Sequence, residues 1–131
     1  MALRTPLAGA RGLGAAKSGF SHWWSSRVTS IALIPLTLWF VFALAALRSM
    51  DYATFVDWVR SPLVTVLLIL NLAVTIYHMM LGLRVIIEDY VRPEWLKISG
   101  IVVMNFICVL VLVIGLVALL KISLGASSLW V

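Results

Sequence analysis

Three long apolar segments dominate the pattern of this chain. Runs without a charged residue extend over residues 28–47, 61–83 and 98–120. An α-helix needs about 20 predominantly apolar residues to cross the hydrocarbon core of a bilayer. The runs are apolar throughout and lack the alternation typical of strands in membrane barrels. The sequence therefore predicts an all-α membrane protein with three transmembrane helices.

The residues that flank these runs divide the chain into three parts. We expect a basic N-terminal tail over residues 1–26, a transmembrane anchor over 27–122 and a short C-terminal tail over 123–131. Within the anchor, the spans are expected at about 28–48, 61–88 and 98–121. Pro35 removes a backbone donor and should bend the first span. The connection at 48–60 is interpreted as a short exposed turn or helix at the membrane surface.

Composition supports a membrane protein and excludes other classes. The chain has 131 residues, of which 63% are hydrophobic and only 11% charged, too few for the surface of a soluble domain. The net charge of +5 does not indicate nucleic-acid binding, because the basic residues flank the spans instead of forming one patch. The single cysteine, Cys108, cannot form an internal disulfide.

The distribution of basic residues predicts the orientation in the membrane. Seven of the ten fall before the first span or around the second connection, and three fall on the opposite side. The larger group is Arg4, Arg11, Lys17, Arg27, Arg84, Arg92 and Lys97, and the smaller group is Arg48, Arg60 and Lys121. By the positive-inside rule, the N-terminus lies in the cytoplasm or matrix and the C-terminus lies outside.

The N-terminal tail has two interpretations. It is basic and contains no acidic residue, as an organelle transit peptide would be. We favour a retained cytoplasmic tail, because it lacks a clear amphipathic period and the topology accounts for its charges. Trp23 and Trp24 suit the headgroup level, and Arg27 can reach phosphate or another anion. We interpret His22 as an interfacial residue.

The second span carries a histidine within its apolar run. Positions on the face of His78, within roughly 60° at 100° per residue, hold mostly small or polar residues. Asn71, Thr75, Gly82, Val85 and Asp89 share this face and form a stripe of small and polar groups along an otherwise apolar helix. Gly82 has no side chain, so a flat group or another helix can approach the backbone one turn from His78.

His78 has two interpretations. It can be a packing residue that is hydrogen-bonded across a helix interface, or it can bind haem iron as a neutral imidazole. A low-spin haem usually has two strong axial ligands. His22 is too near the membrane surface to reach the same iron, so a second ligand would come from another subunit.

Asp89 and Tyr90 stand where the second apolar run meets water. Asp89 lies about three turns, or roughly 16 Å, from His78, which excludes a His–Asp hydrogen bond and a catalytic dyad. A tyrosine hydroxyl can donate to a quinone carbonyl, and a carboxylate can hold an arginine or pass protons. The alternative is a solvated helix end with an interfacial aromatic residue.

Together these residues resemble a known family. The segment R-V-T-S-I-A-L at Arg27, the spacing H-x10-D-Y from His78 to Tyr90 and the following V-R-P are similar to the small D-type cytochrome b anchor of succinate dehydrogenase, complex II. The resemblance covers residues 21–120. It implies that His78 is an axial ligand of haem b and that Tyr90 hydrogen-bonds ubiquinone. It also implies that Asp89 supports the quinone site and that Arg27 contacts a haem propionate.

The resemblance further implies a place in an electron-transport complex of the tricarboxylic acid cycle. The expected partners are a flavoprotein subunit, an iron–sulfur subunit and a C-type cytochrome b anchor, which shares the haem and packs against this chain. The chain would pass electrons from the iron–sulfur subunit to quinone and would not be catalytic alone. The expected location is the bacterial inner membrane, with the mitochondrial inner membrane as the alternative.

Two other functions remain open at this level. One is a fumarate reductase anchor, which has a similar architecture and favours the reverse flux. The other is a three-span accessory subunit of a transporter, in which His78 and Asp89 serve packing or a proton relay.

Overall fold

The computed structural model describes residues 17–48 and 51–125, which form four helices. These are α2 (Lys17–Leu47), α3 (Tyr52–Arg60), α4 (Pro62–Tyr90) and α5 (Glu94–Ser123). Three of them are long and apolar enough to cross a membrane, over Phe20–Leu47, Pro62–Tyr90 and Glu94–Ser123. The prediction of an all-α protein with three spans is confirmed. Residues 1–16 of the expected N-terminal tail and 126–131 of the C-terminal tail lie outside the described residues.

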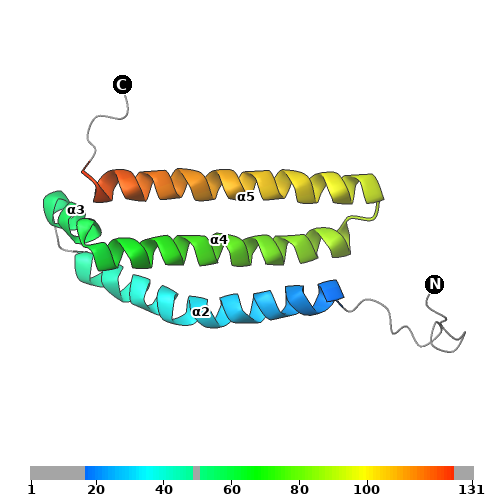
Figure 1. The fold of residues 1–131 in the computed structure, drawn as a ribbon, viewed down its shortest axis with the longest axis horizontal. Coiled ribbons are helices and arrows are strands. Elements are labelled where there is room, and N and C mark those ends of the chain that lie inside the picture. Colours follow the sequence, from blue (N-terminus) through cyan, green and yellow to red (C-terminus); the bar gives the residue numbers. More distant parts are fainter. Residues whose placement is uncertain (1–16, 49–50, 126–131) are drawn as a thin grey trace, which may run out of the picture.

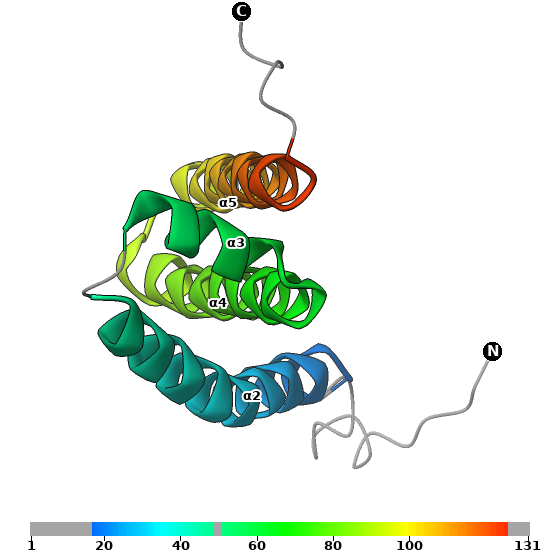
Figure 2. The same ribbon diagram turned by 90° about the vertical axis from the view of Figure 1, so that its left-hand side faces the viewer.

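The three long helices lie side by side, with α4 in the middle. Helices α2 and α5 pack on opposite sides of α4, and α3 lies across the end where α2 leads into α4 (Figures 1 and 2). The start of α2, the end of α4 and the start of α5 all lie at the other end. The end of the molecule that carries Tyr90 is therefore the end at which α2 begins.

The helices continue beyond the uncharged runs. Helix α2 begins at Lys17, before the first run, and α4 continues through the charged residues up to Tyr90. Pro35 lies inside α2, which is bowed (Figure 2). Proline removes one backbone hydrogen bond, and a bend is the usual result. Pro93 is the residue that precedes α5, where its missing N–H costs no hydrogen bond.

The connection at 48–60 contains the short helix α3, which is joined by hydrogen bonds to the start of α4 and the end of α5. The buried hydroxyl of Thr65 lies 2.7 Å from the carbonyl of Val59, 3.1 Å from that of Ser61 and 3.0 Å from the hydroxyl of Ser123. Arg60 Nε donates to the carbonyl of Ile122 across 3.5 Å. These bonds join α3, the start of α4 and the end of α5 into one corner.

Two local features lie next to this corner, one just before α3 and one just after α5. The hydroxyl of Thr54 donates to the carboxylate of Asp51, which precedes α3, and lowers the pKa of Asp51. After α5, Gly125 has φ +67°, in the left-handed region that favours glycine, and its N–H bonds to the carbonyl of Ile122 at 3.2 Å.

Few side chains of the described residues are buried within the chain itself. They are Val59, Thr65, Leu81, Met104 and Cys108. Most of the apolar side chains on α2, α4 and α5 face outward, as expected for helices whose surroundings are lipid or another apolar subunit.

Candidate functional site

The best-defined polar contact between α2 and α4 is made by His78. Its ring is half-buried, and its Nδ1 lies 2.8 Å from the Oγ1 of Thr29 on α2. The hydroxyl of Thr29 also lies 2.8 Å from the carbonyl of Ser25 and 3.1 Å from that of Ser26, both within its own helix. One ring nitrogen of His78 is thus held by the neighbouring helix.

Gly82 lies open one turn along α4 from His78. A Cβ atom added at Gly82 would meet nothing within 4 Å, and the residue is exposed. Gly115 on α5 is the opposite case, because an added Cβ would lie 2.7 Å from Cδ2 of Leu72. The backbone beside His78 is therefore accessible from outside the chain, whereas the space beside Gly115 is filled by Leu72 of α4.

The small and polar stripe that shares the face of His78 has two parts, which differ in their surroundings. Toward the start of α4, Asn71 and Thr75 line a cavity of about 340 Å³ together with residues of α2 and α5, among them Phe40 and Gly115. Asn71 Oδ1 is buried there and has no hydrogen-bond partner. Within this part of the stripe the amide oxygen of Asn71 is buried inside the chain, whereas Thr75 is exposed, as Gly82 is.

A polar cavity of about 440 Å³ lies between the start of α2 and the end of α4. Its lining is Ser21, His22, Ser25, Tyr77, Leu81, Arg84 and Glu88. His22 Nε2 is buried without a hydrogen-bond partner, and Arg84 Nε donates to Glu88 Oε1 at 2.9 Å. His22 precedes Thr29 by seven residues, about 10 Å along the helix axis, so it is well separated from the contact with His78.

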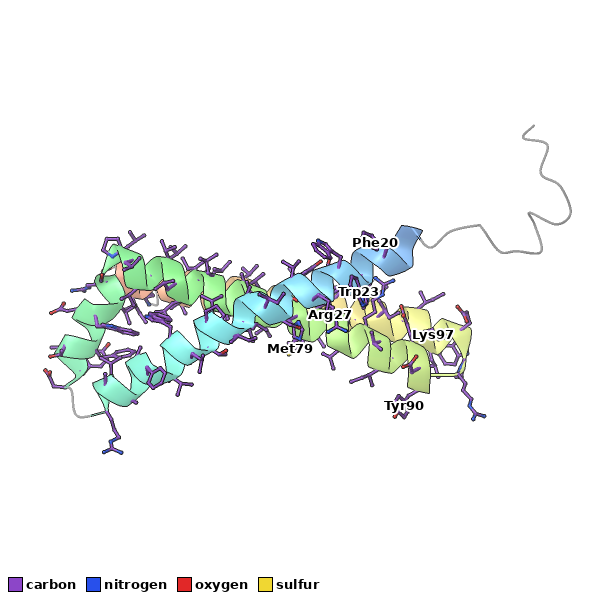
Figure 3. All side chains as sticks on the ribbon, turned by 90° about the horizontal axis from the view of Figure 1, so that it is seen from below. Phe20, Trp23, Arg27, Met79, Tyr90 and Lys97 are labelled. Carbon is purple, nitrogen blue, oxygen red and sulfur yellow. The ribbon has the colours of Figure 1, made fainter. Side chains whose placement is uncertain are left out.

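Arg27 lies away from His78. It precedes Thr29 by two residues, so its side chain leaves α2 roughly 200° around the helix axis from that of Thr29, which contacts His78. Its guanidinium carbon lies 5.6 Å from the ring centroid of Trp23, a cation–π contact. Figure 3 shows Arg27, Trp23 and Phe20 in sequence along the first turns of α2. Arg27 is exposed and can meet an anion supplied by another molecule.

Asp89 and Tyr90 end α4 on the surface. Both are exposed, and 83% of Tyr90 is accessible. Tyr90 projects outward from the end of α4, near the start of α5 that carries Lys97 (Figure 3). The structure thus keeps the Asp89–Tyr90 pair and His78 on one uninterrupted helix, about three turns apart.

The side chains that could bind metal suit a haem with one axial ligand from this chain, and they do not suit a metal ion bound by this chain alone. Over the residues that the structure describes, no group of three or more His, Cys, Asp or Glu side chains gathers in one place. A bis-ligated haem needs only one axial side chain from each of two sources. His78 meets this requirement, with one nitrogen fixed by Thr29 and open backbone nearby at Gly82.

Sequence reasoning missed two features of this region. Thr29 gave no signal of its own, because its contact with His78 depends on how α2 and α4 align. The Arg84–Glu88 ion pair could have been found from its i,i+4 spacing on a helix.

Comparisons with known proteins agree with the arrangement of spans and motifs. Residues 1–121 match the family model described as succinate dehydrogenase/fumarate reductase transmembrane subunit. No solved structure matches the chain.

Among the similar proteins are several with the name succinate dehydrogenase hydrophobic membrane anchor subunit. The protein of Rickettsia conorii is 33% identical over 84% of this chain and 88% of its own length. That of Rickettsia bellii is 30% identical over 88% of this chain and 92% of its own length. That of Paracoccus denitrificans is 28% identical over 93% of this chain and 94% of its own length.

With its three spans and these bacterial relatives, the chain is a multi-pass protein of the bacterial inner membrane. It belongs to the family of succinate dehydrogenase/fumarate reductase transmembrane subunits, as a hydrophobic membrane anchor of the D type found in succinate dehydrogenase.

Proposed function

We propose that this anchor supplies one axial ligand to a haem b and part of a ubiquinone site in a succinate:quinone oxidoreductase. It helps electrons pass from an iron–sulfur subunit to quinone and does not oxidise succinate itself. The names of the relatives, all succinate dehydrogenase anchors, favour this direction over fumarate reduction.

The observation that carries the proposal is the environment of His78. The imidazole lies well inside the span, is held at Nδ1 by Thr29, and has exposed glycine backbone one turn away. A neutral imidazole binds iron without the cost of burying a charge. When bound, haem b supplies a reversible one-electron centre. His22, the other histidine of the chain, is held elsewhere, so the second axial ligand comes from a C-type anchor that packs against this chain.

The quinone part of the proposal rests on the end of α4. The phenol of Tyr90 is exposed at the polar end of a span, where it can donate a hydrogen bond to a quinone carbonyl. Asp89 is adjacent and exposed, and its carboxylate can hold a cation or relay a proton to the reduced quinone. Arg27 is assigned to a haem propionate, which its long side chain would have to reach around α2 from a face turned away from His78.

The proposed partners follow from what the described residues form and expose. Residues 17–48 and 51–125 form three apolar spans and one short helix, and none of these elements makes a domain that could hold a flavin or several iron–sulfur clusters. A flavoprotein and an iron–sulfur subunit must provide succinate oxidation. The exposed apolar faces of α2 and α5 offer surface to the second anchor and to lipid.

The test is purification through this chain in mild detergent, followed by identification of subunits and an optical spectrum. His78→Ala should remove or strongly alter the low-spin haem spectrum, because one of two axial ligands is lost. His22→Ala should leave the spectrum largely unchanged and serves as the histidine control. An unchanged spectrum in a fully assembled His78→Ala complex would refute ligation by this residue.

A further inference from the structure

The hydroxyl of Thr29 has three neighbours and only one proton. Two neighbours are the carbonyls of Ser25 and Ser26, at 2.8 and 3.1 Å, and the third is Nδ1 of His78, at 2.8 Å. Carbonyl oxygens only accept hydrogen bonds, so the arrangement that makes the most hydrogen bonds gives the proton of Thr29 to the turn of its own helix, as helical threonines commonly do. The remaining contact is then completed by a proton on Nδ1 of His78.

This assignment fixes the tautomer of His78. A neutral imidazole carries one N–H, and its other nitrogen has a free lone pair. With the proton on Nδ1, the lone pair is on Nε2. That is the nitrogen that points away from Thr29, so the side chain is prepared for ligation at Nε2 before any ligand arrives.

We propose that Thr29 is a positioning residue for His78: its hydroxyl accepts the Nδ1–H hydrogen bond and so fixes both the tautomer and the orientation of the imidazole. The inference rests on the proposed haem ligation by His78. It adds a role for α2, which presents to α4 a hydroxyl whose own proton is already used by the carbonyls of Ser25 and Ser26.

The expected effect has a direct physical cause. A hydrogen bond accepted from the N–H of a ligating histidine makes the ring a stronger electron donor and limits its rotation, and loss of such a partner typically costs about 10- to 100-fold in metal affinity or activity. A stronger donor stabilises the oxidised iron more than the reduced iron. Removal of the hydroxyl should therefore raise the midpoint potential of the haem and weaken haem retention.

The experiment compares three variants in the intact complex. Thr29→Val keeps the branched shape and deletes the hydroxyl, and Thr29→Ser keeps the hydroxyl. Thr37→Val is the matched control, because the hydroxyl of Thr37 also bonds to carbonyls of its own helix, those of Leu33 and Ile34, but lies exposed elsewhere on α2. The readouts are haem per complex, the low-spin spectrum and the midpoint potential. Succinate oxidation with an acceptor ahead of quinone serves as the assembly check.

We expect Thr29→Val to shift the potential upward and to lower haem content on dilution or washing, whereas Thr29→Ser and Thr37→Val match the parent. An assembled Thr29→Val complex with parental potential and haem content overturns the positioning role. If Thr29→Val does not assemble, Thr29→Ala replaces it, since it adds no bulk. Failure of both to assemble, beside a normal Thr37→Val, would assign Thr29 to helix packing and also overturn the role.

The result with His78→Ala separates this inference from the proposed function. A parental spectrum in assembled His78→Ala removes haem ligation, and the role of Thr29 falls with it. A lost spectrum in His78→Ala together with a parental Thr29→Val complex removes only the role of Thr29.

Discussion

At the scale of single residues, Tyr90 has two possible roles, as a hydrogen-bond donor to quinone and as an aromatic residue of the membrane interface. One substitution can separate them. Tyr90→Phe keeps the ring and deletes the hydroxyl that would donate to quinone. A hydrogen bond between uncharged partners contributes about 0.5–1.5 kcal/mol, and about 1.4 kcal/mol is tenfold in rate. We expect normal assembly and a loss of several-fold to tenfold in quinone reduction, measured with succinate and a soluble ubiquinone analogue.

The control for Tyr90→Phe is succinate oxidation with an acceptor that takes electrons ahead of quinone, which should remain at the parental rate. Parental quinone reductase rate and apparent quinone affinity in Tyr90→Phe would contradict the donor role. Tyr90 would then be an aromatic residue of the membrane interface, as its exposure also permits.

The candidate site could be predicted only along its own helix. The positions of His78, Gly82 and Tyr90 relative to one another follow from helical geometry, and the continuous helix of 29 residues bears out that basis. The partner of His78 could not be predicted, because Thr29 lies 49 residues away and its contact depends on the alignment of two packed helices. The contact of Arg27 with Trp23 also has i,i+4 spacing, but it was not predicted because the first helix was not expected to extend back to Trp23.

At the scale of helices, two glycines distinguish packing inside the chain from contacts outside it. Gly115→Leu should force Leu72 and α4 to shift, because even a Cβ would lie 2.7 Å from Cδ2 of Leu72. Overpacking of this kind typically costs about 1–3 kcal/mol. At Gly82 an added Cβ would meet nothing within 4 Å, and a leucine would occupy the space beside His78 that we propose for the haem or the second anchor.

We therefore expect different defects in the purified complexes. Gly115→Leu should lower the temperature of thermal denaturation and leave the haem spectrum unchanged. Gly82→Leu should reduce haem content or alter the spectrum. A Gly82→Leu complex that matches the parent in both measurements would mean that nothing approaches α4 at this position.

The helices themselves were the most predictable part of the fold. Long uncharged runs gave the three spans, because burial in lipid requires apolar side chains over the full thickness of the bilayer. The continuation of α2 back to Lys17 was not predicted, since the residues before Arg27 are not an apolar run. The corner around Thr65 was not predicted either, because its bond to Ser123 spans 58 residues and its bond to Val59 depends on the turn between α3 and α4.

At the scale of the whole molecule, the two ends of the helix row should lie on opposite sides of the membrane. The positive-inside rule places the α4–α5 connection in the cytoplasm and α3 outside. In a Cys108→Ala background, cysteine at Glu94 should react with an impermeant thiol reagent from the cytoplasmic side, and cysteine at Asp57 from the outer side. Both residues are exposed, so each can be reached without unfolding.

The residues near Met1 and Val131 lie outside the described residues, and the same experiment can include them. They should react from opposite sides, with Met1 cytoplasmic. Reaction of Glu94 and Asp57 positions from one side would contradict a chain with three crossings, and a simple exchange of sides would contradict the orientation alone.

The uninterrupted course of α4 fixes the spacing of the residues that we propose for the redox site. His78, Gly82 and Tyr90 lie on one continuous helix that contains no proline after its first residue, so the distances between them cannot be adjusted locally. A single inserted residue between His78 and Tyr90 would turn the phenol by about 100° and move it by about 1.5 Å relative to the imidazole. Many side chains between these residues face outward and can be exchanged, but the number of residues cannot. This helix therefore tolerates changes in composition far better than changes in length.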